Sequence, residues 1–197
     1  MRLDTLLIPF VYFIAGATSL AGVASTFYFK DDLHLSIAQV QILASIGIIP
    51  WSTKPLYGIL SDRVPVYGFR RKPYLIFAGF LGSSGYLMMA WFVHGFRGVL
   101  IATLLSAIGF ALADVIVDGI VAERSKTQKE AGKLQALCRA SLMTGALLVA
   151  YLSGVLVTWV GSRTVFVITG ILPLFTVLFA LSMSERASDT EVLTSFR

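Results

Sequence analysis

Residues 102–124, ATLLSAIGFALADVIVDGIVAER, carry two aspartates inside an apolar stretch that is long enough to span a bilayer. A membrane-spanning helix needs about 20 predominantly apolar residues. An ionised carboxylate in hydrocarbon is costly, so such residues are expected to face a bundle interior or a watery cavity. Asp114 and Asp118 are four residues apart and therefore lie on one face of the helix. The stretch predicts a membrane helix whose functional face carries these two carboxylates.

The composition of the whole chain agrees with a membrane protein. Of the 197 residues 56% are apolar and 14% are charged, and the mean hydropathy is +0.80. A soluble domain with this balance would have too little polar surface to cover itself. The net charge of +5 does not indicate nucleic-acid binding, because the basic residues gather in short segments between apolar runs. The single cysteine, Cys138, excludes an intramolecular disulfide and a cysteine-rich metal site.

Six apolar segments predict six transmembrane helices in an all-α membrane protein. A capping box of Ser36 and Gln39 is expected to open the second helix, and Pro50 and Pro55 to kink it. Small residues four apart, such as Ser141 with Gly145, predict close packing between helices. Residues 1–183 are then a six-span transmembrane domain and residues 184–197 a polar cytoplasmic tail. The predicted spans are residues 6–29, 36–60, 74–93, 99–122, 134–160 and 164–183.

The connectors between these segments differ in charge. By the positive-inside rule, the basic side faces the cytoplasm, so both termini are predicted to be cytoplasmic, or stromal in a plastid envelope. The sequence does not distinguish a plasma membrane from a plastid envelope. The other side carries Lys30, Arg97 and Arg163 as its basic residues. The basic side carries Arg2, Arg63, Arg70, Arg71, Lys72, Arg124, Lys126, Lys129, Lys133, Arg186 and Arg197.

Several motifs occur in order along nearly the whole chain. The segment KPLYGILSDR at residues 54–63, followed by GFRRKP at 68–73, resembles the cytoplasmic loop signature of major facilitator transporters. The motif ADVIVD at 113–118, the following Glu123-Arg124 pair, GKLQALC at 132–138 and FKDDL at 29–33 are more specific. Together the motifs resemble the folate–biopterin transporter family of the major facilitator superfamily.

This resemblance implies a secondary transporter for folate, biopterin or related pteridines, with or without proton coupling. It also implies twelve spans in two six-helix halves, of which this chain resembles the amino-terminal half. Alternating access in such folds moves one half against the other around a midplane site. We therefore interpret the chain as a fragment, a truncated product, or half of a homodimeric assembly. Arg139 departs from the family pattern, in which an uncharged residue is expected.

Four charged residues are candidates for substrate binding or proton coupling. A pterin ring exposes two parallel N–H donors, and a carboxylate accepts such a pair as it does from arginine. Asp118 or Asp114 could therefore hold a pteridine ring, and either could carry a coupling proton. Lys54 and Arg139 are the intramembrane cations that could meet the anionic tail of folate. Alternatively, these aspartates and cations pair with one another and fasten the helices together.

The loop between the second and third spans is expected to act as a conformational latch. Asp62, Arg63, Arg70 and Arg71 can tie a short turn at a helix end through carboxylate–guanidinium pairs. Glu123, by contrast, belongs to a mixed-charge connector that we interpret as a solvated face.

Two other function classes are compatible with parts of the sequence. Residues 114–124 resemble in part the aspartate motif of membrane enzymes that transfer phosphoalcohols from CDP-linked lipids. The spacing differs, and residues 125–137 supply no further aspartate. A non-transporting subunit that assembles with a full-length transporter is the other alternative. We expect no enzyme activity, cofactor, metal or nucleic-acid partner, and expect a lipid bilayer and a small-molecule substrate.

Overall fold

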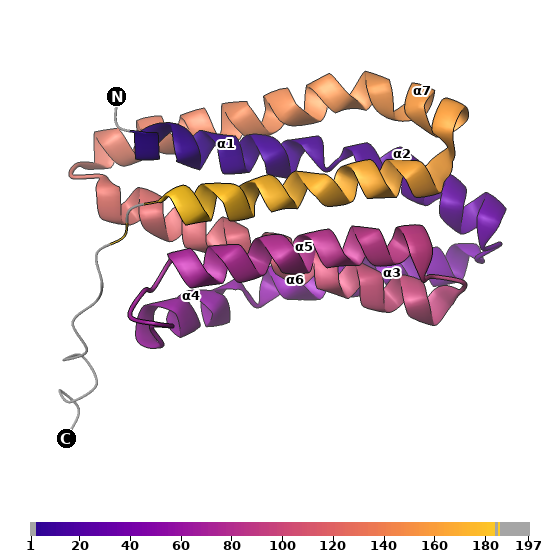
Figure 1. The fold of residues 1–197 in the computed structure, drawn as a ribbon, viewed down its shortest axis with the longest axis horizontal. Helices are drawn as coiled ribbons and strands as arrows, with labels where there is room; N and C mark the ends of the chain where they lie inside the picture. Colours follow the sequence, from indigo (N-terminus) through magenta and orange to yellow (C-terminus); the bar gives the residue numbers. More distant parts are fainter. Residues whose placement is uncertain (1–2, 184, 186–197) are drawn as a thin grey trace.

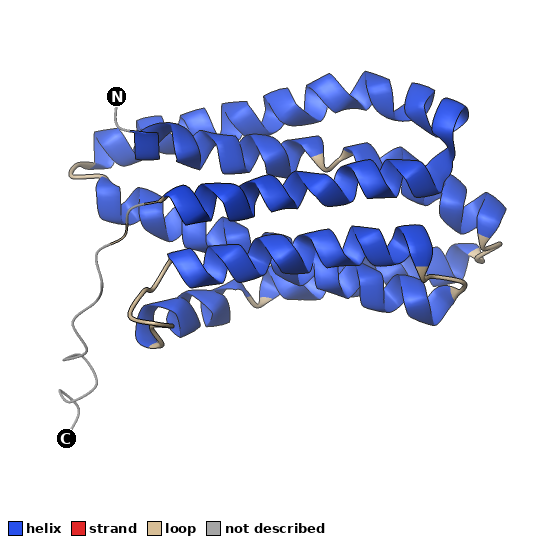
Figure 2. Ribbon diagram, in the orientation of Figure 1, coloured by secondary structure: helices blue, strands red, loops and turns tan. Residues whose placement is uncertain are grey.

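The computed structural model describes residues 3–183 and Glu185, with side chains from Ile8 onward. This part of the chain is a bundle of helices that lie side by side, and it contains no strand (Figures 1 and 2). The all-α architecture predicted from the sequence is confirmed. In chain order the elements are α1 (Leu3–Ala17), α2 (Leu20–Phe27), the π-helical η1 (Tyr28–Asp32), α3 (Ile37–Ser52), α4 (Lys54–Arg63), α5 (Lys72–Trp91), α6 (Phe96–Arg124) and α7 (Gln128–Ser182).

The number of spans depends on how these helices are counted. Four of the described helical stretches are long and apolar enough to cross a membrane: Ile8–Asp32, Lys72–Trp91, Phe96–Arg124 and Gln128–Ser182. The 55-residue α7 turns back at Gly161, whose φ of 79° lies in the left-handed region, so it contains two arms (Figure 1). The split pair α3 and α4 forms the remaining segment. The predicted six spans are reached when both arms and this split segment are counted.

The second span is interrupted rather than merely kinked. α3 ends at Ser52 and α4 begins at Lys54, so the break at Thr53 lies between Pro50 and Pro55. Proline removes a backbone donor and clashes with the preceding turn, which favours a helix end here. At the start of α3 the predicted capping box is present, because the Ser36 and Gln39 side chains bond reciprocally to backbone N–H groups.

Glycines allow two pairs of helices to pack backbone against backbone. A Cβ built on Gly145 of α7 would lie 2.3 Å from the Phe13 carbonyl oxygen of α1. A Cβ on Gly109 of α6 would lie 2.4 Å from the backbone nitrogen of Gly82 in α5. In lipid, such close packing replaces the hydrophobic drive that operates in water. The crossings fix α1 against α7 and α5 against α6, and so position the inward-facing residues of α1 and α6.

The two ends of the bundle differ in charge. α1 begins and α7 ends at the same end of the bundle (Figure 1). This end, called the basic end below, also carries Arg63, residues 70–72 and residues 124–133. The opposite end carries residues 30–34, 92–97 and 161–163. The predicted polar tail lies outside the described residues, apart from Glu185.

Candidate functional site

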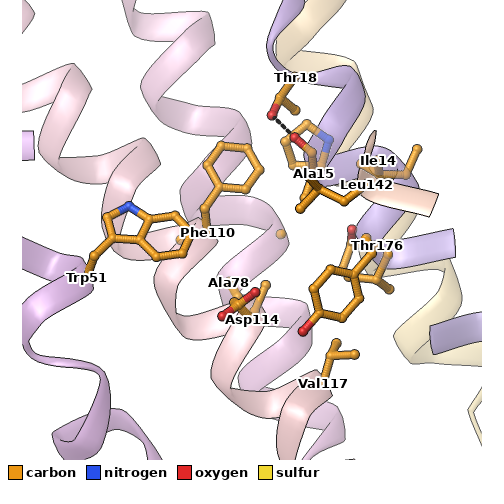
Figure 3. Close-up of a pocket in the computed structure, with 16 residues that line it drawn as sticks. Ile14, Ala15, Thr18, Trp51, Ala78, Phe110, Asp114, Val117, Leu142 and Thr176 are labelled. Atoms are coloured by element: carbon orange, nitrogen blue, oxygen red, sulfur yellow. Dashed lines mark hydrogen bonds between the residues drawn. The ribbon is translucent and has the colours of Figure 1, made fainter. Parts of the chain in front are cut away.

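A cavity of about 180 Å³ lies among α1, α3, α5, α6 and α7. Its wall is mostly apolar and includes one carboxylate, Asp114. Trp51 and Phe110 lie on one side, Ile14 and Thr18 on the other, and Asp114 projects from α6 between them (Figure 3). An apolar cavity with a few polar groups is the usual form of a small-molecule site.

Asp114 forms an ion pair with Lys54 from the second span. The Lys54 Nζ lies 2.5 Å from Asp114 Oδ2 and 4.4 Å from the centre of the Trp51 ring. Lys54 is the first residue of α4, directly after the break at Thr53. The break therefore brings a cation beside the cavity, against Asp114 and Trp51 of its wall, where the carboxylate and the aromatic ring both stabilise it.

Asp118 lies one turn from Asp114 toward the basic end, and two neutral donors bind it. Its Oδ1 accepts hydrogen bonds from the Tyr12 hydroxyl at 2.5 Å and from the Gln135 Nε2 at 3.0 Å. These donors come from α1 and α7, so Asp118 joins three helices. The structure thus brings Lys54 and Asp114 together, but it gives Asp118 partners that the sequence analysis did not name.

Arg139 does not join this cluster. Its side chain is exposed on the first arm of α7, and within the described residues it forms no hydrogen bond or ion pair. The alternative in which Arg139 fastens an aspartate is therefore wrong for this conformation. Asp118 instead accepts hydrogen bonds from two neutral donors, both on Oδ1.

Of the predicted latch residues, Asp62 binds Arg71, whose side chain is 10% exposed. Arg71 Nη2 lies 2.7 Å from Asp62 Oδ1 and 2.5 Å from Glu123 Oε1, and Nη1 donates to Ser61 Oγ at 3.0 Å. The guanidinium lies over Gly119, where a Cβ would meet it at 2.8 Å. Arg71 therefore ties the ends of α4, α5 and α6 together.

The other two basic latch residues behave differently. Arg63 is exposed at the end of α4. Arg70 uses its backbone, which donates to Glu185 Oε1 at 2.8 Å, as does the backbone of Arg71 at 2.9 Å. The backbone N–H of Lys72 donates to Glu185 Oε2 at 2.8 Å. The Glu185 carboxylate therefore caps the N-terminus of α5, where a negative charge is favourable.

Five residues of these networks, Ser61 among them, were missed by the sequence analysis. Glu123, interpreted as part of a solvated face, instead binds Arg71, although its side chain remains 55% exposed. Tyr12, Gln135 and Glu185 bind groups 17 to 115 residues away in the chain. For Tyr12 the sequence did offer one signal, namely a hydroxyl group within an otherwise apolar span.

The fold and the sequence both have known counterparts. A crystal structure of a peptide transporter, POT, superposes with a TM-score of 0.72 at 15% identity, covering 91% of this chain and 38% of that one. At this identity the match shows the fold alone, namely half of a major facilitator fold.

Relatives by sequence carry transporter names. A folate-biopterin transporter of Synechocystis sp. is 38% identical over 190 residues, which is 95% of this chain and 38% of the relative. Probable folate-biopterin transporter 2 of Arabidopsis thaliana is 41% identical, over 75% of this chain and 30% of the relative. Folate transporter 2 of Plasmodium falciparum is 27% identical over 89% of this chain. The chain thus spans about two fifths or less of these relatives' lengths. The BT1 family model matches residues 15–195, and the chain belongs to this family.

Proposed function

We propose that this chain forms one half of a secondary transporter that carries folate, biopterin or a related pteridine across a membrane. The observation that carries the proposal is its 38% identity, over 95% of its length, to a folate-biopterin transporter. The inward-facing carboxylates of α6 support it, because a pteridine offers the N–H donors that such carboxylates accept. The named relatives are transporters, which argues against the phosphotransferase alternative.

The size of the cavity supports assembly with a second half. About 180 Å³ is small beside the 300–1,000 Å³ or so of typical ligand pockets. The cavity is then one part of a larger substrate site, and a second set of six helices supplies the rest of that site. That second set is a further transporter half or a second copy of this chain.

We assign complementary roles to the charged residues. Asp118 binds the pteridine ring. Lys54, held by Asp114, receives the carboxylates of a folate tail, and Asp114 becomes the group that takes a coupling proton when the pair opens. Arg139, exposed on the first arm of α7, guides the same anionic tail toward the cavity.

At the basic end, Arg71 with Asp62 and Glu123 acts as a latch that closes when the ends of α4, α5 and α6 meet. Arg63 and Arg70 assist through the positive field that they add to this end. The excess of Lys and Arg supports a cytoplasmic, or stromal, location for the basic end and for both termini.

Uptake of labelled folate and biopterin into proteoliposomes that contain this chain tests the proposal. Asp118→Asn should abolish saturable uptake, because an amide cannot accept two parallel N–H donors. Asp32→Asn is the matched control, since Asp32 is exposed at the opposite end of the bundle. Equal loss in both variants, or none in Asp118→Asn, would contradict the assigned role of Asp118.

Absence of uptake by the correctly inserted wild-type chain would favour the alternative, a non-transporting subunit. Co-purification of a twelve-span relative with the chain would then support that alternative. Binding of pteridine without uptake would instead indicate that a second half is needed for transport but not for recognition.

A further inference from the structure

We propose that the side-chain amide of Gln135 donates to Asp118 at the position that a substrate N–H group takes, and that the substrate displaces this amide when it binds. This inference rests on the proposed function and adds a residue that controls access to Asp118. It also specifies the ligand chemistry: a neutral ring edge with two parallel N–H donors, such as an amino-pyrimidinone.

The hydrogen bonds of Asp118 leave room for such a ligand on one oxygen and not on the other. Oδ1 already accepts from Tyr12 at 2.5 Å and from Gln135 at 3.0 Å, which fills its two lone-pair positions. Within the described residues, Oδ2 accepts no hydrogen bond. A parallel donor pair needs one position on each oxygen. One of the two present donors must therefore leave before the pair can bind.

Burial decides which donor leaves. Tyr12 is 4% exposed and belongs to a cluster of buried hydrophobic residues that also includes Ile116 and Cys138. A buried hydroxyl that loses its acceptor pays a desolvation penalty. Gln135 is exposed, so its amide exchanges the carboxylate for water at little cost. Gln135 therefore leaves, and Tyr12 stays as the residue that orients the carboxylate.

The charges around Asp118 select a neutral donor rather than an anion. Asp114 lies one turn away on the same helix, and its Lys54 partner is already paired. An anionic group placed at Asp118 would meet two carboxylates and a neutralised cation. The amide of Gln135, a neutral N–H donor, is the chemical counterpart of the ring edge that replaces it.

Ligand binding to the purified full chain in nanodiscs tests this inference through the intrinsic fluorescence of pterin. Gln135→Leu removes the competing donor, so it should bind pterin about threefold or more tightly than the wild type. Tyr12→Phe should bind more weakly, and Asp118→Asn should not bind. Gln128→Leu is the matched control, because Gln128 is exposed at the start of the same helix. Lumazine, which has a carbonyl in place of the pterin amino group, should bind to none of these proteins.

Two results would overturn the inference about Gln135, and they differ in their consequence for the proposed function. Weaker pterin binding by Gln135→Leu, with wild-type binding intact, would make Gln135 a direct ligand contact and leave the proposed function standing. No pterin binding by a folded wild-type chain would overturn the inference, and the uptake assay described above would then decide whether the proposed function also fails. Size-exclusion profiles and thermal unfolding of every variant establish that each protein is folded.

Discussion

Lys54 and Asp114 bring opposite charges from two spans together beside an apolar cavity, whose wall includes Asp114. Their side chains are 32% and 19% exposed, so both are partly removed from water. For such a pair the desolvation cost offsets much of the attraction, but removal of one partner leaves an uncompensated charge. Replacing both Lys54 and Asp114 by neutral residues should therefore destabilise the protein less than replacing either one alone.

A double-mutant cycle in detergent measures this consequence. Lys54→Met should lower the free energy of unfolding by about 1–3 kcal/mol, because Asp114 is then left unpaired beside the cavity. Adding Asp114→Asn should recover most of that loss. Thermal unfolding of the wild type, both single variants and the double variant gives the coupling energy. Additive losses would show that the two charges act independently.

Glycine decides how closely the helices approach one another. Gly145 lies where α7 crosses α1, and its missing Cβ leaves room for the Phe13 carbonyl. Gly154 lies nine residues further along the same arm, and a Cβ there would meet nothing within 4 Å. The two positions share a helix and a residue type but differ in what surrounds them.

The same substitution at both positions should therefore have opposite effects at the scale of the element. Gly145→Ala should lower the unfolding temperature, since the backbone of α1 must move to admit the methyl group. Gly154→Ala should leave stability unchanged or raise it by up to about 1 kcal/mol, because alanine favours a helix over glycine. Thermal unfolding in one detergent compares them. Equal effects would contradict the close α1–α7 crossing.

The whole molecule has a basic end that also holds the start of α1 and the end of α7 (Figure 1). Because the chain crosses the bundle an even number of times, the start of α1 and the end of α7 lie at the same end. The connectors of this end hold most of the positive charge. This asymmetry, rather than any single residue, predicts the orientation of the bundle in a membrane.

Labelling of introduced cysteines from one side of the membrane tests that orientation. Lys126→Cys, exposed at the basic end, should react with an impermeant maleimide only after the membrane is opened. His94→Cys, exposed at the opposite end, should react in intact cells. The native Cys138 is fully buried, so its background should be low. The reverse pattern would invert the assigned topology.

Features that depend on nearby residues could be predicted from the sequence. Hydropathy and segment length gave the helical spans, because crossing a bilayer needs a local apolar run. Ser36 with Gln39 gave the start of α3. Pro50 with Pro55 predicted a kink in the second span, and the structure has a complete break between them at Thr53. The spacing of Asp114 and Asp118 placed both on one face of α6, since helical periodicity is also local.

The partners of those carboxylates were decided only by the tertiary structure. Tyr12 and Asp118 are separated by 106 residues, and Arg71 and Glu123 by 52. Whether such side chains meet depends on how far each helix is rotated about its axis and how closely neighbouring backbones approach. Those quantities are set by glycine contacts such as that of Gly145 with α1, which arise only when all the helices pack. The sequence by itself determined a helical membrane protein with an acidic inward face, and packing determined which donors that face meets.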